Sequence, residues 1–282
     1  MRGSGPLGRT APANALRWLL LLAVLFWSLA PIVLVVLSSF KASNRIFEFP
    51  PSLWFTPTFD HYVNLFRQWP EFGRTLWNSA VVTLGAGALT LLVSVPAAYA
   101  YSRYRSRLLT WSAFGMLAVR MFPPIVITLP LYPVVRALNL QDTHLVLIVL
   151  YATFFVSLAT WVMKAFIDEV PRELDESAKL DGANVLQLLF WIILPLSRHG
   201  IVASVVFVVV YAWKEFLFAF LFTTSGARTA PAIISEMLGS VTGVAWGPLL
   251  AAATVQLVPL LVFVLLVQHF LVKGLTIGST KG

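Results

Sequence analysis

The segment Glu176-Ser177-Ala178-Lys179-Leu180-Asp181-Gly182, followed by Ile192-Ile193-Leu194-Pro195, decides the interpretation of this 282-residue chain. Residues 169–181 hold five of the twelve acidic residues in the sequence, and apolar residues are threaded between them. The stretch lies between two strongly apolar segments. It is itself too polar to cross a bilayer, so we expect an amphipathic element at a membrane surface.

Local signals around this segment predict two short helices joined by a turn. Pro171 suits the first turn of a helix, because its missing N–H group loses no hydrogen bond there, and acidic residues then follow near the positive end of the helix dipole. Gly182 tolerates the left-handed conformation that ends a helix. Asn184 is a good cap for a second helix over 185–193, which we expect Pro195 to end.

The same residues resemble the cytoplasmic loop of the membrane subunits of binding-protein-dependent ABC importers. That family pattern is Glu-Ala-Ala, three residues, Gly, nine residues, and Ile-x-Leu-Pro. The sequence matches it with one small-for-small change, Ser177 in place of the first Ala, at Glu176, Ala178, Gly182, Ile192, Leu194 and Pro195. The wider context resembles the carbohydrate branch of the family, in particular the maltose-type second permease. The alternative interpretation is an ordinary amphipathic loop helix.

The resemblance implies an all-α, polytopic membrane protein with the type I ABC importer permease fold, six transmembrane helices and both termini in the cytoplasm. It implies a bacterial or archaeal cytoplasmic membrane, a second homologous permease subunit, two copies of a cytoplasmic ABC ATPase and an extracytoplasmic solute-binding protein. ATP and Mg²⁺ would bind to the ATPase, and this chain would carry no cofactor. The residues expected to couple to the ATPase are Glu173, Glu176, Ser177, Ala178, Asp181, Gly182, Ala183, Ile192, Leu194 and Pro195.

Composition indicates a membrane protein independently of the resemblance. Hydrophobic residues make up 59% of the chain and charged residues only 11%, against about 25% charged in soluble domains. The mean hydropathy is +0.83. The absence of cysteine excludes disulfides and thiol chemistry, and the four histidines show no metal-ligand spacing. The net charge of +8 comes from basic residues at the ends of apolar segments, so it indicates membrane orientation and not binding to nucleic acid.

Hydropathy divides the chain into a cytoplasmic tail (1–16), a transmembrane domain (17–272) and a second cytoplasmic tail (273–282). We prefer a retained first helix to a cleaved signal peptide, because the apolar run is long and no small-residue cleavage site follows promptly. The predicted coupling loop covers 167–198. The predicted spans are about 17–38, 77–101, 108–131, 144–166, 201–223 and 246–270.

Basic residues support this orientation. Twelve of them fall on the predicted inner side and six on the outer side, and four of those six lie in the long first loop. The short loops therefore follow the positive-inside rule, which the inverted topology would violate.

Ionisable residues inside the predicted spans are candidates for the substrate path. Arg120 has two interpretations, a path residue or an arginine bound to carbonyls that Pro123 and Pro124 leave free. A pair between Arg120 and Glu215 is one arrangement for these charges. Trp213 suits stacking on a sugar, although a buried Trp is more often packing. Lys214 departs from the Asn that related sugar permeases carry here. The candidate path residues are Arg120, Tyr211, Trp213, Lys214 and Glu215.

The favoured hypothesis is a non-catalytic permease subunit of an ATP-driven importer for a sugar, oligosaccharide or sugar alcohol. The sequence has no phosphate-binding P-loop and no hydrolytic cluster. The alternative is an ion-coupled secondary transporter using Arg120, Lys214 and Glu215. This alternative predicts interrupted helices in two repeats, but the sequence shows no internal repeat, and the docking loop would have no role. A third hypothesis, a membrane scaffold without transport, leaves the charges in the spans without a role.

Overall fold

The computed structural model describes residues 11–239 and 243–277, and these parts of the chain are helical without any strand. Residues 1–10 and 278–282 of the two expected tails lie outside the described residues. The elements, in chain order, are α1 (Ala11–Ser39), η1 (Ser43–Arg45), α2 (Asp60–Gln68), α3 (Phe72–Arg103), α4 (Arg107–Met121), α5 (Pro124–Ala137), α6 (His144–Asp168), α7 (Arg172–Leu180), α8 (Val185–Leu188), η2 (Leu189–Ile193), α9 (Leu194–Leu196), α10 (Arg198–Trp213), α11 (Leu217–Phe222), α12 (Ala230–Leu238) and α13 (Trp246–Ile277).

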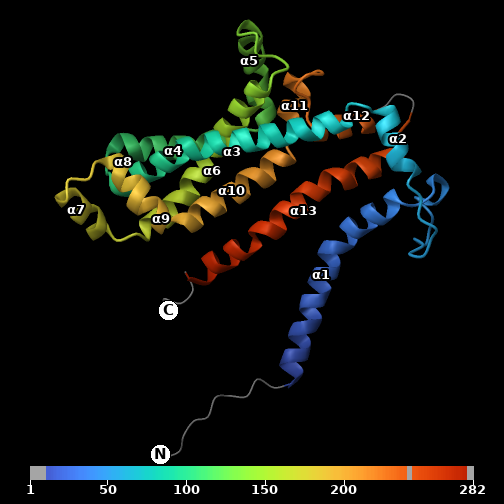
Figure 1. Cartoon of the computed structure of the whole chain (residues 1–282), viewed down its shortest axis with the longest axis horizontal. Coiled ribbons are helices and arrows are strands. Elements are labelled where there is room, and N and C mark those ends of the chain that lie inside the picture. The colour runs from blue at the N-terminus through green and yellow to red at the C-terminus, as the bar shows by residue number, and fades with distance from the viewer. Residues whose placement is uncertain (1–10, 240–242, 278–282) are drawn as a thin grey trace, which may run out of the picture.

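The helices α3, α6 and α10 pack against one another, and α13 lies along α10 (Figure 1). The short helices α7, α8 and α9 gather at one end of this bundle, and α2 and α12 lie at the other end. Three clusters of buried side chains hold the bundle together at its middle and near its two ends. They include Leu147 and Val208 in the middle, Met163 and Ile193 near α7, and Phe72 and Ile233 near α2.

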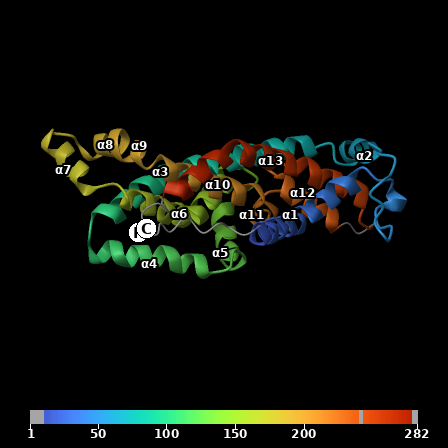
Figure 2. The same cartoon turned by 90° about the horizontal axis from the view of Figure 1, so that it is seen from below.

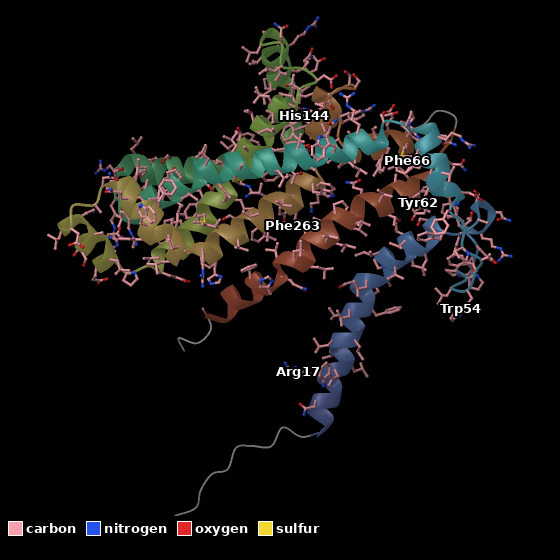
Figure 3. All side chains as sticks on the ribbon, in the orientation of Figure 1. Arg17, Trp54, Tyr62, Phe66, His144 and Phe263 are labelled. Carbon is pink, nitrogen blue, oxygen red and sulfur yellow. The ribbon has the colours of Figure 1, made fainter. Side chains whose placement is uncertain are left out.

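The first helix diverges from the bundle, and its apolar side chains are exposed in the isolated chain. Figure 3 shows Arg17 on the part of α1 that extends away from the other helices. The helix begins at Ala11, inside the region 1–16 expected to be a tail. At the other end, α13 runs to Ile277 and so passes the expected boundary at residue 272.

Among residues 11–239 and 243–277, four helices are long and apolar enough to cross a membrane. Up to six spans result if each of two bent helix pairs, α4 with α5 and Val185–Leu196 with α10, counts as one. The prediction of a straight third span over 108–131 is wrong. Helices α4 and α5 meet there at an angle of 98°. Figure 2 shows α4 along one side of the bundle, and Figure 1 shows α5 pointing away from it. Phe122 and Pro123 are extended, because a residue that precedes proline disfavours the helical conformation, and Pro124 then starts α5.

The expected fifth span over 201–223 is also interrupted. Helix α10 ends at Trp213 and α11 begins at Leu217, and residues 214–216 connect them. The carboxylate of Glu215 accepts hydrogen bonds from the first N–H groups of α11, so this side chain serves as a helix cap inside the span.

The second coupling helix ends at Leu196, one residue beyond Pro195, so the prediction that this proline ends it holds to within one residue. A π-helical turn, Leu189–Ile193, precedes the proline, and the helix then runs through α9 before the chain bends by 80° into α10. In a regular α-helix the ring of Pro195 would crowd the carbonyl group of Trp191. The wider π turn accommodates the ring.

Candidate coupling loop and translocation path

The loop between α6 and α10 folds as predicted at its turn. Gly182 has a φ angle of +83°, in the left-handed region that glycine adopts without strain, and the N–H of Ala183 bonds to the carbonyl of Ala178 at 2.9 Å. Asn184 then caps α8 in a reciprocal arrangement with Gln187, where each side chain accepts a backbone N–H at 2.9 Å. The turn therefore sets the direction of α8 relative to α7.

A buried ion pair holds α7 against the end of α3. The Nε of Arg103 lies 2.8 Å from Oδ2 of Asp175, and each side chain is 7% exposed. The same guanidinium donates to the carbonyl of Val170 at 2.9 Å, and Arg172 donates to the carbonyl of Ser102 at 2.9 Å. These contacts attach the coupling helix to a long membrane helix through charged hydrogen bonds.

The predicted coupling residues separate into an outer and an inner set. The acids Glu173, Glu176 and Asp181 are exposed, as are Ser177, Gly182 and Pro195. Ala178 is buried against the loop, and Ala183, Ile192 and Leu194 are half-buried. Exposed apolar side chains flank the acids, namely Leu180, Leu186, Phe190 and Trp191. An outer surface with both acidic and apolar groups is chemically suited to docking another protein.

Sequence reasoning missed the role of Arg103 and Asp175. We interpreted the arginine only as an orientation signal and the aspartate only as a dipole acid. One signal was present: Asp175 lies three residues before Ala178 and so shares its buried helix face, and a buried carboxylate requires a partner. The identity of that partner, 72 residues away in sequence, is not readable from local pattern.

The candidate path residues lie around the two helix breaks. The guanidinium of Arg120 lies 5.7 Å from the centre of the Phe154 ring, and the ammonium of Lys214 lies 4.5 Å from that of Tyr211. Within the described ranges 11–239 and 243–277, the ion pairs are Arg103–Asp175, Lys164–Asp168 and Arg228–Glu236. The suggested pair between Arg120 and Glu215 is therefore wrong: the carboxylate is bound to the N–H groups of Leu217 and Phe218 instead.

Trp213 does not share the exposure of its neighbours. Its side chain is buried, and the indole Nε1–H donates to the carbonyl of Gln256 in α13 at 3.0 Å. This contact favours the packing interpretation over sugar stacking, since the indole joins α10 to α13. The backbone carbonyl of Glu215 likewise accepts a hydrogen bond from the hydroxyl of Tyr151 at 3.3 Å.

A polar network at the opposite end of the bundle was not predicted. The carboxylate of Asp142 accepts the backbone N–H groups of residues 224–227 at 2.8–3.2 Å. Burial of this carboxyl opposes its ionisation, but the four N–H groups outweigh that effect and hold its pKa below the ordinary value. Asn78 in α3 bonds to the carbonyls of Gly226 and Arg228 and to the ring of His144, which Figure 3 labels at the start of α6.

The two candidate sites differ in the groups that they expose. In the parts of the chain that the structure describes, no group of three His, Cys, Asp or Glu side chains is arranged to hold a metal ion. The groups that stand out are the exposed acidic and apolar loop surface and the cations beside the helix breaks.

Comparison with known proteins identifies the family. Residues 90–277 match the family model described as "Binding-protein-dependent transport system inner membrane component". A probable ABC transporter permease protein of Sinorhizobium fredii, y4oR, is 37% identical over 269 residues, which cover 93% of this chain and 95% of that protein. The trehalose transport system permease protein SugB of Mycobacterium tuberculosis is 35% identical over 271 residues, 92% of this chain and 94% of its own.

The fold is that of a solved importer subunit. A chain in the crystal structure of a bacterial ABC transporter involved in the import of the acidic polysaccharide alginate superimposes with a TM-score of 0.74. The superposition covers 95% of this chain and 99% of that one, at 17% identity, so it compares the folds alone. The protein is a membrane permease and belongs to the family of binding-protein-dependent transport system inner membrane components, the permease subunits of ABC transporters.

Proposed function

We propose that this chain forms one half of the pore of an ATP-driven importer and couples solute uptake to a separate ATPase through residues 171–195. The observation that carries the proposal is the two-sided construction of α7. Its inner face is held to α3 by the buried Arg103–Asp175 pair, and its outer face presents acids such as Glu176 to the surroundings. A partner that pushes on this outer face would move α3, because the connection is short and charged.

The orientation follows from the distribution of charge. The α7 end of the bundle carries Arg103, Arg105, Arg107 and Lys164 close to the ends of membrane helices. By the positive-inside rule this end faces the cytoplasm, where an ATPase would be available. The α2 and α12 end then faces outward and meets the solute-binding protein.

The remaining partners follow from the incomplete state of the isolated chain. Most apolar side chains of α1 are exposed although this helix contacts α13, and α4 has no buried residue. We infer a second homologous permease that completes the pore with this one, and two copies of the ATPase, which hold ATP and Mg²⁺. This chain then supplies no catalytic group.

The solute is inferred to be a saccharide. The relative in Mycobacterium tuberculosis is named for trehalose, and the solved transporter with the same fold for a polysaccharide. The ion-coupled alternative also predicts interrupted helices, and the expected third and fifth spans are interrupted here, between α4 and α5 and between α10 and α11. Membership of the binding-protein-dependent family nevertheless favours ATP-driven import.

Affinity purification of the subunit from its native membrane tests the coupling loop. Gly182→Trp and Gly182→Ala impose the same left-handed strain on the turn, and a Cβ at this position meets no atom of this chain within 4 Å. Only the Trp variant projects a large side chain toward a docked partner. We expect the ATPase to co-purify with the wild-type and Ala subunits and to be lost with the Trp subunit.

A charge reversal gives the second arm of this test. Glu176→Lys should abolish solute-stimulated ATP hydrolysis by the purified complex, whereas Glu169→Lys, an exposed acid at the same end of the bundle but outside residues 171–195, should leave it intact. Normal stimulation in the Glu176 variant, or retention of the ATPase by Gly182→Trp, would show that residues 171–195 do not form the docking surface.

A further inference from the structure

The two interrupted spans meet beside the middle of α6. Helix α4 ends one residue after Arg120, and α10 ends one residue before Lys214. Arg120 lies beside the ring of Phe154, and Lys214 lies beside the ring of Tyr211, which neighbours Phe155. Phe154 and Phe155 are near the midpoint of the 25-residue helix α6. Because α6 crosses the membrane, the two helix breaks place positive charge at about half the depth of the bilayer.

A row of aromatic rings joins the two cations. The guanidinium of Arg120 lies over Phe154, the Phe154 and Phe155 ring centres are 5.4 Å apart, and those of Phe155 and Tyr211 are 6.2 Å apart. The ammonium of Lys214 then lies 4.5 Å from the centre of the Tyr211 ring. We call Arg120, Phe154, Phe155, Tyr211 and Lys214 the cation–aromatic row.

Neither cation of this row takes part in an ion pair within the described residues. The carboxylate of Glu215, next to Lys214 in the sequence, is directed at the N–H groups of α11. The hydroxyl of Tyr151, beside the same break, donates to the carbonyl of Glu215. Cation–π attraction offsets only part of the cost of holding a cation at this depth, so the row requires water or an anion.

The exposed part of the row suits a ring-shaped solute. Tyr211 is 43% exposed and Lys214 is exposed beside it, and Phe216 at the same break is 45% exposed. An aromatic face packs against the apolar face of a sugar ring, and an ammonium or guanidinium group binds carboxylate, phosphate or sulfonate oxygens. Trp213 and the Glu215 carboxylate do not face a solute in this way, because each is committed to backbone groups.

We propose that the transported saccharide carries a negative charge, and that Arg120 and Lys214 receive its anionic group while the sugar ring packs on Tyr211. The proposal rests on the proposed function, since it assigns a substrate class to the same pore. Carboxylate, phosphate and sulfonate share the chemistry that the row recognises.

The natural absence of cysteine permits a direct test in the assembled transporter. Phe216→Cys provides the only thiol of this chain beside the row, and mass spectrometry of the chain reports its modification. Two methanethiosulfonate reagents with the same reactive group are compared, one bearing a sulfonate and one a trimethylammonium group. The measured quantity is the labelling rate of the sulfonate reagent divided by that of the trimethylammonium reagent. We expect this ratio to be about tenfold higher at the cysteine than for a small free thiol, because the positive charge of the row concentrates anions.

Variants of the cations provide the control. Adding Arg120→Gln and Lys214→Asn to the cysteine variant should remove the preference, whereas adding Arg136→Gln, an exposed cation at the end of α5, should keep it. Trigalacturonate should slow the labelling and maltotriose should not. The proposal is overturned if neither reagent reaches the cysteine, or if the cysteine variant shows no sulfonate preference because a partner's acid neutralises the row. It is also overturned if the cation variants keep the preference, or if maltotriose protects as well as trigalacturonate.

The labelling readout separates the two proposals. It reports the charge of the pore in the purified assembly and does not depend on ATP hydrolysis. A normal sulfonate preference in a complex that lacks an ATPase would refute the proposed coupling function and leave the anionic site standing. Loss of the preference in a complex that hydrolyses ATP would do the reverse.

Discussion

Asp175→Asn tests whether the buried pair with Arg103 is what makes α7 a rigid lever. The substitution keeps the shape of the side chain and removes its charge. Arg103 would remain 7% exposed with the carbonyl of Val170 as its remaining strong acceptor. Removing one partner of a buried ion pair costs about 3–5 kcal/mol, because the other charge is left buried without compensation. We therefore expect α7 to detach from α3 more often by a factor of about 100 or more.

Hydrogen–deuterium exchange of the peptide 172–183 measures this local opening directly. Asp168→Asn is the matched control, since it breaks the Lys164–Asp168 pair at the same end of the molecule. Those two side chains are 27% and 42% exposed, so the loss should be about 0–1 kcal/mol. The double variant Arg103→Met with Asp175→Leu removes both charges and should exchange more slowly than Asp175→Asn. Equal exchange in the Asp175 and Asp168 single variants would refute the argument.

Two further predictions concern packing and the outer end. A Cβ at Gly200 would lie 2.8 Å from the Cβ of Phe166, whereas a Cβ at Gly115 would meet no atom within 4 Å. Gly200→Ala should therefore destabilise the purified subunit by about 1–3 kcal/mol, and Gly115→Ala should not. Thermal unfolding of both variants tests this. Native hydrogen bonds lower the pKa of Asp142 below its ordinary value of 3.8, so its contribution to stability should be complete above about pH 4 and diminish as the pH falls further. Asp142→Asn should lose that stability at neutral pH, and its melting temperature should depend less on pH below about pH 4.

The turn of the coupling loop could be predicted because its signals are local. Only glycine adopts a φ angle of +83° without strain, and Asn184 caps the next helix through a residue three positions away. The end of that helix beside Pro195 could be predicted as well, since the helix stops at Leu196. The π turn that precedes the proline was not predicted.

The bends in the third and fifth spans illustrate a limit of hydropathy. Pro123 and Pro124 are visible in the sequence, but an apolar run of sufficient length predicts a span whether the helix is straight or broken. The break before α11 is harder to predict from the sequence. Glu215 indicates only a charged residue in a membrane span, and its role as a helix cap is apparent only from the structure. Contacts such as Asp142 with residues 224–227 are distant in sequence, so local pattern does not contain them.

Helix α3 links the two ends of the helical bundle. Its 32 residues extend about 48 Å, enough to cross the membrane and project at both sides. One end is fixed to the coupling helix by Arg103, and the other end is fixed through Asn78 to the loop that carries Gly226 and precedes α12. A displacement of α7 by a closing ATPase would therefore be felt at the outer surface through one helix and two sets of polar contacts. Both attachments are buried and hydrogen-bonded, as a lever requires, because a loose attachment would absorb the movement before it reached the pore.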